Sequence, residues 1–176
     1  MSDARSRGSD ARRPLRYLAR IFALTCAATA AAVFVAEHLA YNATPSIKVG
    51  FYWISRADEL RRGDRVLFDQ PESVRDLVRA RRWLRPGAFM LKEIVAVSGD
   101  EVCTTDSDFF AAGRHLGSIP ERDSQGRALP RFEFCGRVPA GAYYVGSSAP
   151  MSFDSRHFGP VRAEQIRGRA HALWTY

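Results

Sequence analysis

Hydrophobic and polar positions divide the chain into an N-terminal apolar run and a longer part with short alternating segments. Residues 21–36 carry no charged side chain, and residues 39–41 can extend this run past Glu37 and His38. A span of ~20 apolar residues crosses the ~30 Å of bilayer hydrocarbon. The pattern therefore predicts that residues 21–41 form a membrane anchor or a signal segment, with a buried helix of a soluble protein as the alternative.

Beyond residue 46, short segments rich in aromatic and β-branched side chains alternate with Gly, Asp and Pro, a pattern typical of strands and turns. The predicted strands are 51–55, 65–68, 89–97, 101–104, 131–135, 142–145 and 170–175. Residues 72–84 instead space their apolar side chains as on a helix, among four arginines that form either a solvated face or a contact with anionic lipid headgroups. We therefore expect a mainly β domain with a short helix insertion, behind one N-terminal transmembrane helix.

Charge is unevenly distributed along the chain. The formal net charge is +7, and six arginines against two aspartates place +4 of it in residues 1–20. The rest of the chain is only mildly basic, which gives no support for nucleic-acid binding. A basic flank before an apolar segment stays in the cytoplasm. We expect residues 1–20 in the cytoplasm, residues 21–41 in the bacterial inner membrane, and the domain of residues 42–176 in the periplasm, anchored or released by cleavage.

Composition narrows the class of protein. A chain of 176 residues with 46% hydrophobic and 26% charged residues folds around one modest core and is neither disordered nor a polytopic membrane protein. Cys103 and Cys135 are an even pair in the predicted exported part, where an oxidising compartment favours a disulfide; two free thiols are the alternative. Neither lies in a Cys-x-x-Cys motif, so zinc is not expected, and no other metal or cofactor is predicted.

Lysine is scarce, because 24 of the 26 basic residues are arginine and only Lys48 and Lys92 are lysine. Arginine keeps its proton, whereas a lysine whose pKa is lowered can act as a base. Lys92 lies in predicted strand 89–97 with apolar residues on both faces, so burial should lower the pKa of its amine. A neutral Lys92 can take a proton from a serine hydroxyl. The alternative is a lysine that extends to solvent from a sheet edge.

A second polar run covers residues 152–160, between aromatic side chains and a Gly-Pro pair. It offers hydroxyl groups that can accept a hydrogen bond from an amine, and Asp154 and Arg156 are a candidate ion pair that fixes the turn. A solvated loop is the alternative. A Ser-His-Asp hydrolase has weak support, because no Gly-x-Ser-x-Gly motif is present.

Four segments resemble, in order, the conserved boxes of the type I signal peptidases. They are Thr-Pro-Ser-Ile-Lys-Val-Gly at 44–50, Gly-Asp-Arg-Val-Leu-Phe at 63–68, Lys-Glu-Ile-Val-Ala-Val-Ser-Gly-Asp at 92–100, and the run from 152 to 161. Within that family, the Phe-Tyr-Trp after the serine box and the Ser-Phe-Asp-x-Arg-x-Phe-Gly-Pro wording of the last box resemble the TraF-type conjugative-transfer peptidases.

The resemblance implies a membrane-associated serine endopeptidase with a Ser–Lys dyad and a signal-peptidase-like β fold. By resemblance, Ser46 is the nucleophile and Lys92 the general base, and Thr44 contributes a hydroxyl to the oxyanion hole. Ser152 matches the hydroxyl that orients the lysine amine, and Asp154 and Arg156 match structural members of the last box.

The implied partners are the lipid bilayer and a precursor protein with small side chains near the scissile bond, a pilin subunit in the conjugative branch. Two functions remain as alternatives: a general type I signal peptidase that removes leader peptides, and a non-catalytic periplasmic scaffold of a secretion apparatus. Lys48 stands where the family usually has Pro and is a rival base. Residues 146–150 replace the family's Gly-Asp-Asn-Arg run, which favours the conjugative branch.

Overall fold

The computed structural model describes residues 12–105 and 107–176. The chain divides into two compact units, with the boundary after residue 39. Residues 1–11, the larger part of the predicted basic flank 1–20, lie outside the described residues. Each unit is described by itself below.

The N-terminal unit contains helix α1 (Arg12–His38), which is continuous over 27 residues. Its segment Leu15–His38 has a mean hydropathy of 2.0. At 1.5 Å per residue the helix is about 40 Å long, enough to cross the hydrocarbon of a bilayer. Residues 39–41, which the apolar pattern allowed as an extension of this segment, instead lie in strand β1 (Leu39–Asn42).

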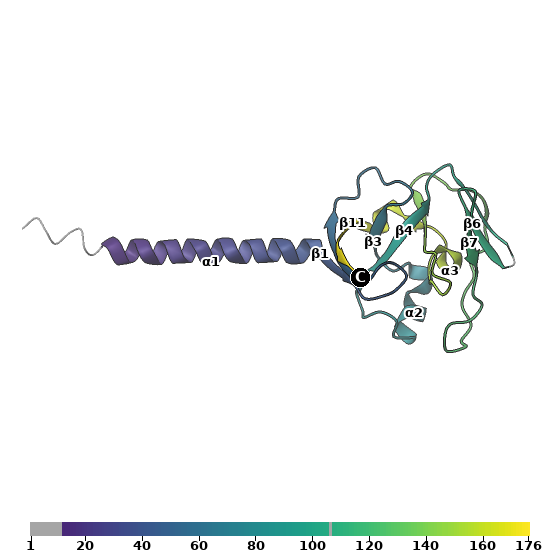
Figure 1. The fold of residues 1–176 in the computed structure, drawn as a ribbon, viewed down its shortest axis with the longest axis horizontal. Coiled ribbons are helices and arrows are strands. Elements are labelled where there is room, and N and C mark those ends of the chain that lie inside the picture. The colour runs from purple at the N-terminus through teal and green to yellow at the C-terminus, as the bar shows by residue number, and fades with distance from the viewer. Residues whose placement is uncertain (1–11, 106) are drawn as a thin grey trace, which may run out of the picture. The chain divides into compact units, whose positions relative to one another are not determined.

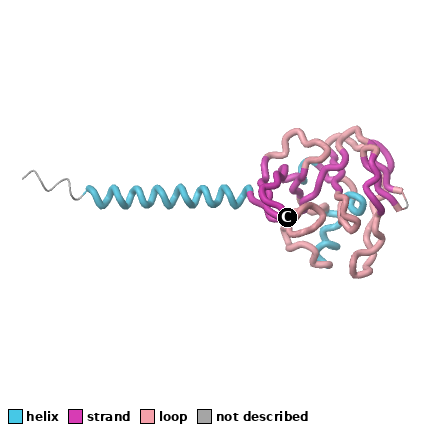
Figure 2. The backbone as a smooth tube through the Cα atoms, in the orientation of Figure 1, coloured by secondary structure: helices cyan, strands magenta, loops and turns pink. Residues whose placement is uncertain are grey.

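The second unit consists mainly of strands and loops (Figure 2), which confirms the predicted fold class. Within the described residues, its larger sheet has seven strands in the order β1-β2-β11-β3-β4-β9-β10. Figure 1 shows β11, β3 and β4 of this sheet side by side. The strands after β1 are β2 (Gly50–Ser55), β3 (Arg65–Phe68), β4 (Met90–Ala96), β9 (Ala142–Gly146), β10 (Val161–Arg162) and β11 (Ile166–Thr175). β4 pairs antiparallel with β3 on one side and β9 on the other. It is therefore an interior strand of this sheet.

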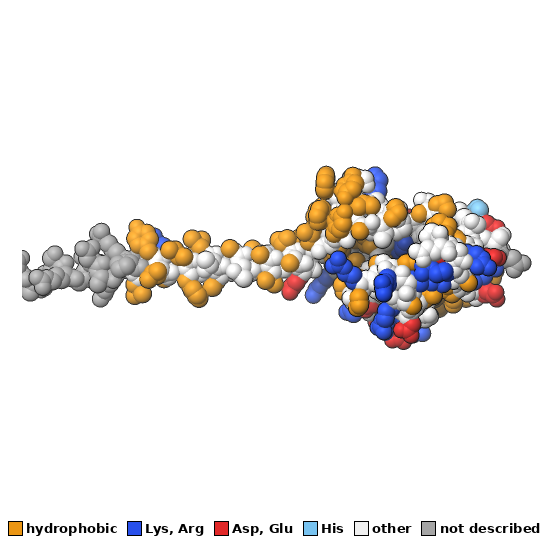
Figure 3. All heavy atoms as spheres, turned by 90° about the horizontal axis from the view of Figure 1, so that it is seen from below, with side chains coloured by type: hydrophobic (Ala, Val, Ile, Leu, Met, Phe, Trp, Pro, Cys, Tyr) orange, Lys and Arg blue, Asp and Glu red, His pale blue; other side chains and the backbone are white. Residues whose placement is uncertain are grey.

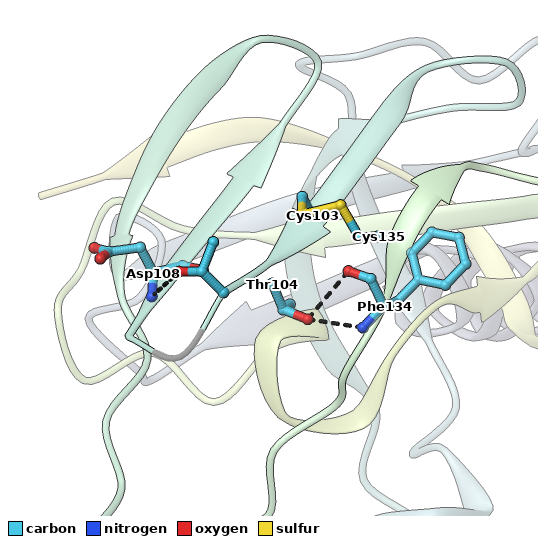
Figure 4. The surroundings of a disulfide bond; sticks show 6 residues. Cys103, Thr104, Asp108, Phe134 and Cys135 are labelled. Atoms are coloured by element: carbon cyan, nitrogen blue, oxygen red, sulfur yellow. Dashed lines mark hydrogen bonds between the residues drawn. A yellow bond between two sulfur atoms is a disulfide. The ribbon is translucent and has the colours of Figure 1, made fainter.

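A second sheet of four strands, again within the described residues, has the order β7-β6-β5-β8. Its strands are β5 (Glu101–Thr104), β6 (Asp108–Ala111), β7 (Arg114–Ser118) and β8 (Cys135–Arg137). The register of β5 and β8 places Cys103 opposite Cys135. The two residues form a disulfide with their Cα atoms 4.0 Å apart (Figure 4).

The predicted strand 131–135 is wrong, because only its last residue is in a strand, β8. Just before β8, one main-chain bond remains, from the Thr104 amide to the Phe134 carbonyl at 2.8 Å, and the Thr104 side chain adds two more. The Thr104 hydroxyl donates to the Phe134 carbonyl at 3.1 Å and accepts from the Phe134 amide at 2.8 Å (Figure 4). The Phe132 amide is bonded to the carbonyl of Arg156, so this stretch follows tertiary contacts that a local pattern does not contain.

Helix α2 (Glu72–Ala80) begins where predicted and ends four residues earlier. Arg82 has φ +55°, its amide donates to the Arg79 carbonyl, and the Trp83 amide donates to the Val78 carbonyl at 3.2 Å. These are the two bonds of a Schellman motif, which usually has Gly at the left-handed position. The turn reverses the chain, so Trp83 does not continue the helix. Two short helices follow later, α3 (Ser155–Phe158) and the 3₁₀ helix η1 (Ala163–Gln165).

Strand β4 lies within the hydrophobic core. Met90 and Ile94 pack in one cluster, which also contains Phe68, and Val95 and Ala96 pack in another. A register shift against β9 between Ile94 and Ala96 interrupts the regular alternation, so the end of β4 serves the second cluster. The strand thus places every side chain from Met90 to Lys92 in buried surroundings.

Candidate active site

Lys92 is a charged side chain in the middle of β4, and only 6% of it is exposed. Its Nζ donates a hydrogen bond to the Oγ of Ser152 at 3.0 Å. Burial lowers the pKa of the Lys92 amine to about 8; the negative charge of Asp154 opposes this shift and the positive charge of Arg156 adds to it. Loss of the Lys92 proton therefore requires far less free energy than for an exposed lysine.

Ser46 lies in the turn between β1 and β2, half-buried. Its Oγ is 3.4 Å from the Oγ1 of Thr44. Its carbonyl accepts a hydrogen bond from the hydroxyl of Ser147, in the segment that follows β9. The turn is also bonded to the buried side chain of Asn42. Sequence reasoning identified Ser46 and Thr44 but missed the roles of Asn42 and Ser147.

The predicted residues meet at a cavity of about 790 Å³. Thr44, Ser46, Lys92 and Ser152 all line it, and its apolar lining includes Trp83, Leu84, Leu129, Met151 and Phe153. In the part of the chain that the structure describes, Lys92 is hydrogen-bonded to Ser152 and not to Ser46. Ser46 and Lys92 thus line one cavity from two separate elements. Catalytic hydrogen bonds are often long in unliganded enzymes and tighten when substrate binds.

Asp154 and Arg156 form an ion pair behind this cavity, with Arg156 Nε 2.9 Å from Asp154 Oδ1 and both side chains almost fully buried. Asp154 also accepts the Arg156 amide at the start of α3. The guanidinium donates to the carbonyls of Ser118 and Ser147, both at 2.9 Å. The pair therefore holds the start of α3 and links the smaller sheet to the segment whose Ser147 is bonded to the Ser46 carbonyl.

The rival base, Lys48, is exposed and does not line the cavity. On an extended chain Ser46 and Lys48 would share a face, but Ser46 lies in a turn. The Lys48 carbonyl accepts the hydroxyl of Tyr52 at 2.6 Å, which holds the main chain and not the amine. Lys48 is therefore poorly placed to take a proton from Ser46.

Histidine and metal chemistry find no support around the cavity. Among the described residues, no histidine lines it, and no group of three or more His, Cys, Asp and Glu side chains is placed to hold a metal ion. His157 is buried, which lowers the pKa of its imidazole, and its Nδ1 lies 2.8 Å from the Pro130 carbonyl. Its ring stacks on Phe153 at 5.1 Å, so it supports the cavity wall from behind.

Comparison of the sequence with known proteins identifies the family to which the chain belongs. A family model described as signal peptidase, peptidase S26, matches residues 15–175. The plasmid transfer protein TraF of Escherichia coli is 32% identical over 142 residues, which cover 71% of this chain and 76% of that protein. The conjugal transfer protein TraF of Agrobacterium tumefaciens (strain 15955) is 32% identical over 178 aligned positions, which cover 94% and 97%.

A signal peptidase I from Enterococcus faecalis has a TM-score of 0.38 at 21% identity, over 65% of this chain and 98% of that one. The sequence comparisons confirm the resemblance drawn from the four segments. Because the family model spans nearly all of the described residues, the chain belongs to the signal peptidase family, peptidase S26, and is a serine peptidase.

Proposed function

We propose that this chain is a membrane-anchored endopeptidase with a Ser46–Lys92 dyad that processes exported precursors for conjugative transfer, and that its substrate is a pilin subunit. The observation that carries the proposal is that buried Lys92, whose amine has a lowered pKa, lines the same cavity as Ser46. The similarity to plasmid and conjugal transfer proteins named TraF supports the role in conjugation.

In the proposed mechanism, neutral Lys92 takes the proton of the Ser46 hydroxyl as its Oγ attacks the scissile carbonyl. With a pKa of about 8, about a tenth of Lys92 is neutral at pH 7. The Ser46 amide and the Thr44 hydroxyl stabilise the oxyanion, and Ser152 keeps the amine pointing into the cavity. Lys92 then donates its proton to the leaving amine, and water hydrolyses the acyl-enzyme.

The membrane is the proposed setting of the reaction. The length and hydropathy of α1 support a spanning helix, and the arginines before it support a cytoplasmic N-terminus with residues 42–176 in the periplasm. Hydrophobic side chains gather on one part of the surface of the second unit, and Lys and Arg side chains on another (Figure 3). Exposed aromatic rings of this unit contact one another: Tyr41 with Phe51, Phe51 with Trp174, and Trp174 with Tyr176. Such Tyr and Trp side chains favour the membrane interface.

The test replaces the dyad in cells that lack the native gene. Ser46→Ala, Lys92→Ala and Lys92→Arg are each expected to leave the precursor unprocessed, because Arg keeps its proton. Lys48→Ala is the matched control and should process normally. The readout is precursor mobility on a gel, with mass spectrometry to identify the accumulated protein. Wild-type processing by Lys92→Arg would contradict the dyad, and undiminished transfer with Ser46→Ala would favour a scaffold.

A further inference from the structure

The turn that carries Ser46 has little regular structure to hold it. Residues 43–49 connect β1 to β2, and Thr44 and Pro45 are exposed. A nucleophile on such a turn needs another source of rigidity, because a displacement of about 1 Å can reduce a reaction rate roughly 100-fold. The side chain that supplies it is Asn42, at the end of β1, which is only 7% exposed.

Asn42 is bonded to the turn through both ends of its amide. Its Nδ2 has two protons and lies within hydrogen-bond distance of three carbonyl oxygens, those of Thr44 at 2.9 Å, Ile47 at 3.0 Å and Lys48 at 3.2 Å. Its Oδ1 accepts from the amide of Thr44 at 3.2 Å and from the Thr44 hydroxyl at 2.9 Å. The orientation of the amide is fixed, because a flip would direct Oδ1 at three carbonyl oxygens. Asn42 thereby closes the turn around Ser46 from both sides.

The bond to Thr44 also sets the direction of a hydroxyl that the proposed mechanism uses. The single proton of Thr44 Oγ1 points to Asn42 Oδ1, so a lone pair of Oγ1 is left to face the Ser46 hydroxyl at 3.4 Å. When an oxyanion forms, the proton can turn to it, because a charged acceptor makes the stronger hydrogen bond. Asn42 Oδ1 then still accepts the Thr44 amide and is not left unsatisfied.

We propose that Asn42 is a positioning residue of the peptidase. It holds the turn that carries Ser46, and it accepts the proton of the Thr44 hydroxyl until an oxyanion forms and takes that hydrogen bond. This rests on the proposed Ser46–Lys92 function. Asn42 lines the same cavity, but both ends of its amide are engaged by the turn and by Thr44. Its effect should therefore appear in the chemical step more than in substrate binding.

The test measures kcat and KM of the full-length enzyme in detergent with the purified precursor that accumulates in the deletion strain. Asn42→Ala should lower kcat about 100-fold and leave KM within about threefold of wild type. Asn42→Asp should show a similar loss, because it retains an acceptor for Thr44 but places an oxygen against the three carbonyls. The matched control is Thr104→Val, which removes a side chain bonded to both polar groups of Phe134 in the other sheet. It should lower stability and keep kcat within about twofold.

A double-mutant cycle with Thr44→Val separates positioning from a general loss of structure. Because Asn42 acts through Thr44, the double variant should lose less activity than the product of the two single losses. If the losses of the two single variants multiply in the double variant, Asn42 does not act through Thr44. Wild-type kcat in Asn42→Ala, with Ser46→Ala inactive, would likewise contradict the positioning role. Neither result would contradict the Ser46–Lys92 dyad. Activity in Ser46→Ala would instead overturn the proposed function.

A measurement on the unmodified enzyme keeps the inference testable if the Asn42 variants do not fold. The Thr44 amide is bonded to Asn42 Oδ1 although Thr44 itself is exposed. Hydrogen–deuterium exchange resolved to this amide should show clear protection, as for the buried strands. Exchange at the rate of an unstructured peptide would show that Asn42 does not hold the turn.

Discussion

Replacement of Lys92 by Met removes the amine and retains an unbranched side chain of similar length. Each unit of pKa change corresponds to about 1.4 kcal/mol, so the lowering of the Lys92 pKa from 10.5 to about 8 disfavours the protonated folded state by about 3 kcal/mol. Met leaves the Ser152 hydroxyl without its donor, which costs about 1 kcal/mol. Lys92→Met should therefore stabilise the fold by about 2 kcal/mol at pH 7 while it abolishes processing.

The pH dependence of this gain follows from the direction of the pKa shift. Folded Lys92 releases its proton near pH 8, and the unfolded chain retains it until about pH 10.5. Between these values the unfolded state binds more protons, so the stability of the wild type rises with pH relative to the variant. The gain should be complete below pH 8 and should disappear as the pH approaches 10.5.

Urea denaturation of the full-length proteins in detergent, followed by tryptophan fluorescence, measures the effect at pH 7 and pH 10. Lys48→Met is the matched control, because Lys48 is exposed, and its stability relative to the wild type should be the same at both values. Two results would show that the amine is not desolvated. One is a Lys92→Met variant that is less stable than the wild type at pH 7. The other is a difference in the free energy of unfolding between variant and wild type that is the same at pH 7 and pH 10.

Three further predictions concern the surroundings of the site. Replacing Cys103 and Cys135 by Ser should lower the free energy of unfolding by about 3 to 4 kcal/mol on the chain-entropy model, which urea denaturation detects as a lower midpoint. The folded variant should process its substrate at the wild-type rate. A midpoint equal to that of the wild type would argue against the disulfide. Arg156→Met leaves the buried carboxylate of Asp154 unpaired and should lower the free energy of unfolding by roughly 3 to 5 kcal/mol. Most of this stability should return when Asp154 is also replaced by an apolar residue, and a double variant as unstable as Arg156→Met would contradict the prediction. Gly168→Ala would place a Cβ 2.5 Å from the Ser55 carbonyl oxygen and should lower the thermal midpoint through overpacking of about 1 to 3 kcal/mol; an unchanged midpoint would contradict the close packing of β11 on β2.

Local patterns predicted those elements whose limits are set by nearby residues. The strands at 65–68 and 101–104 agree with β3 and β5 at every residue, because turn residues bound them on both sides. The burial of Lys92 followed from apolar neighbours on both faces of its strand. The end of α2 could not be predicted, because its left-handed residue is Arg82 and not the Gly that usually marks such a turn.

The parts of the site that the sequence did not predict depend on contacts between distant segments. Ser147 donates to the Ser46 carbonyl across 101 residues, and no spacing rule connects the two. Asn42 is close to Ser46 in sequence, and an Asn just before a turn is a signal for side-chain bonds to the backbone. Its bonds to the carbonyls of Ile47 and Lys48, however, exist only because the turn folds back over it.

The pH dependence of single-turnover processing tests the central claim most directly. With enzyme in excess over the purified precursor, the rate constant should rise about tenfold from pH 6 to pH 7. It should rise less steeply towards pH 8 and level off above the pKa of Lys92, which lies at about 8. This profile is expected because only the neutral amine accepts the Ser46 proton. A rate constant that stays the same from pH 6 to pH 9 would show that Lys92 is not the base.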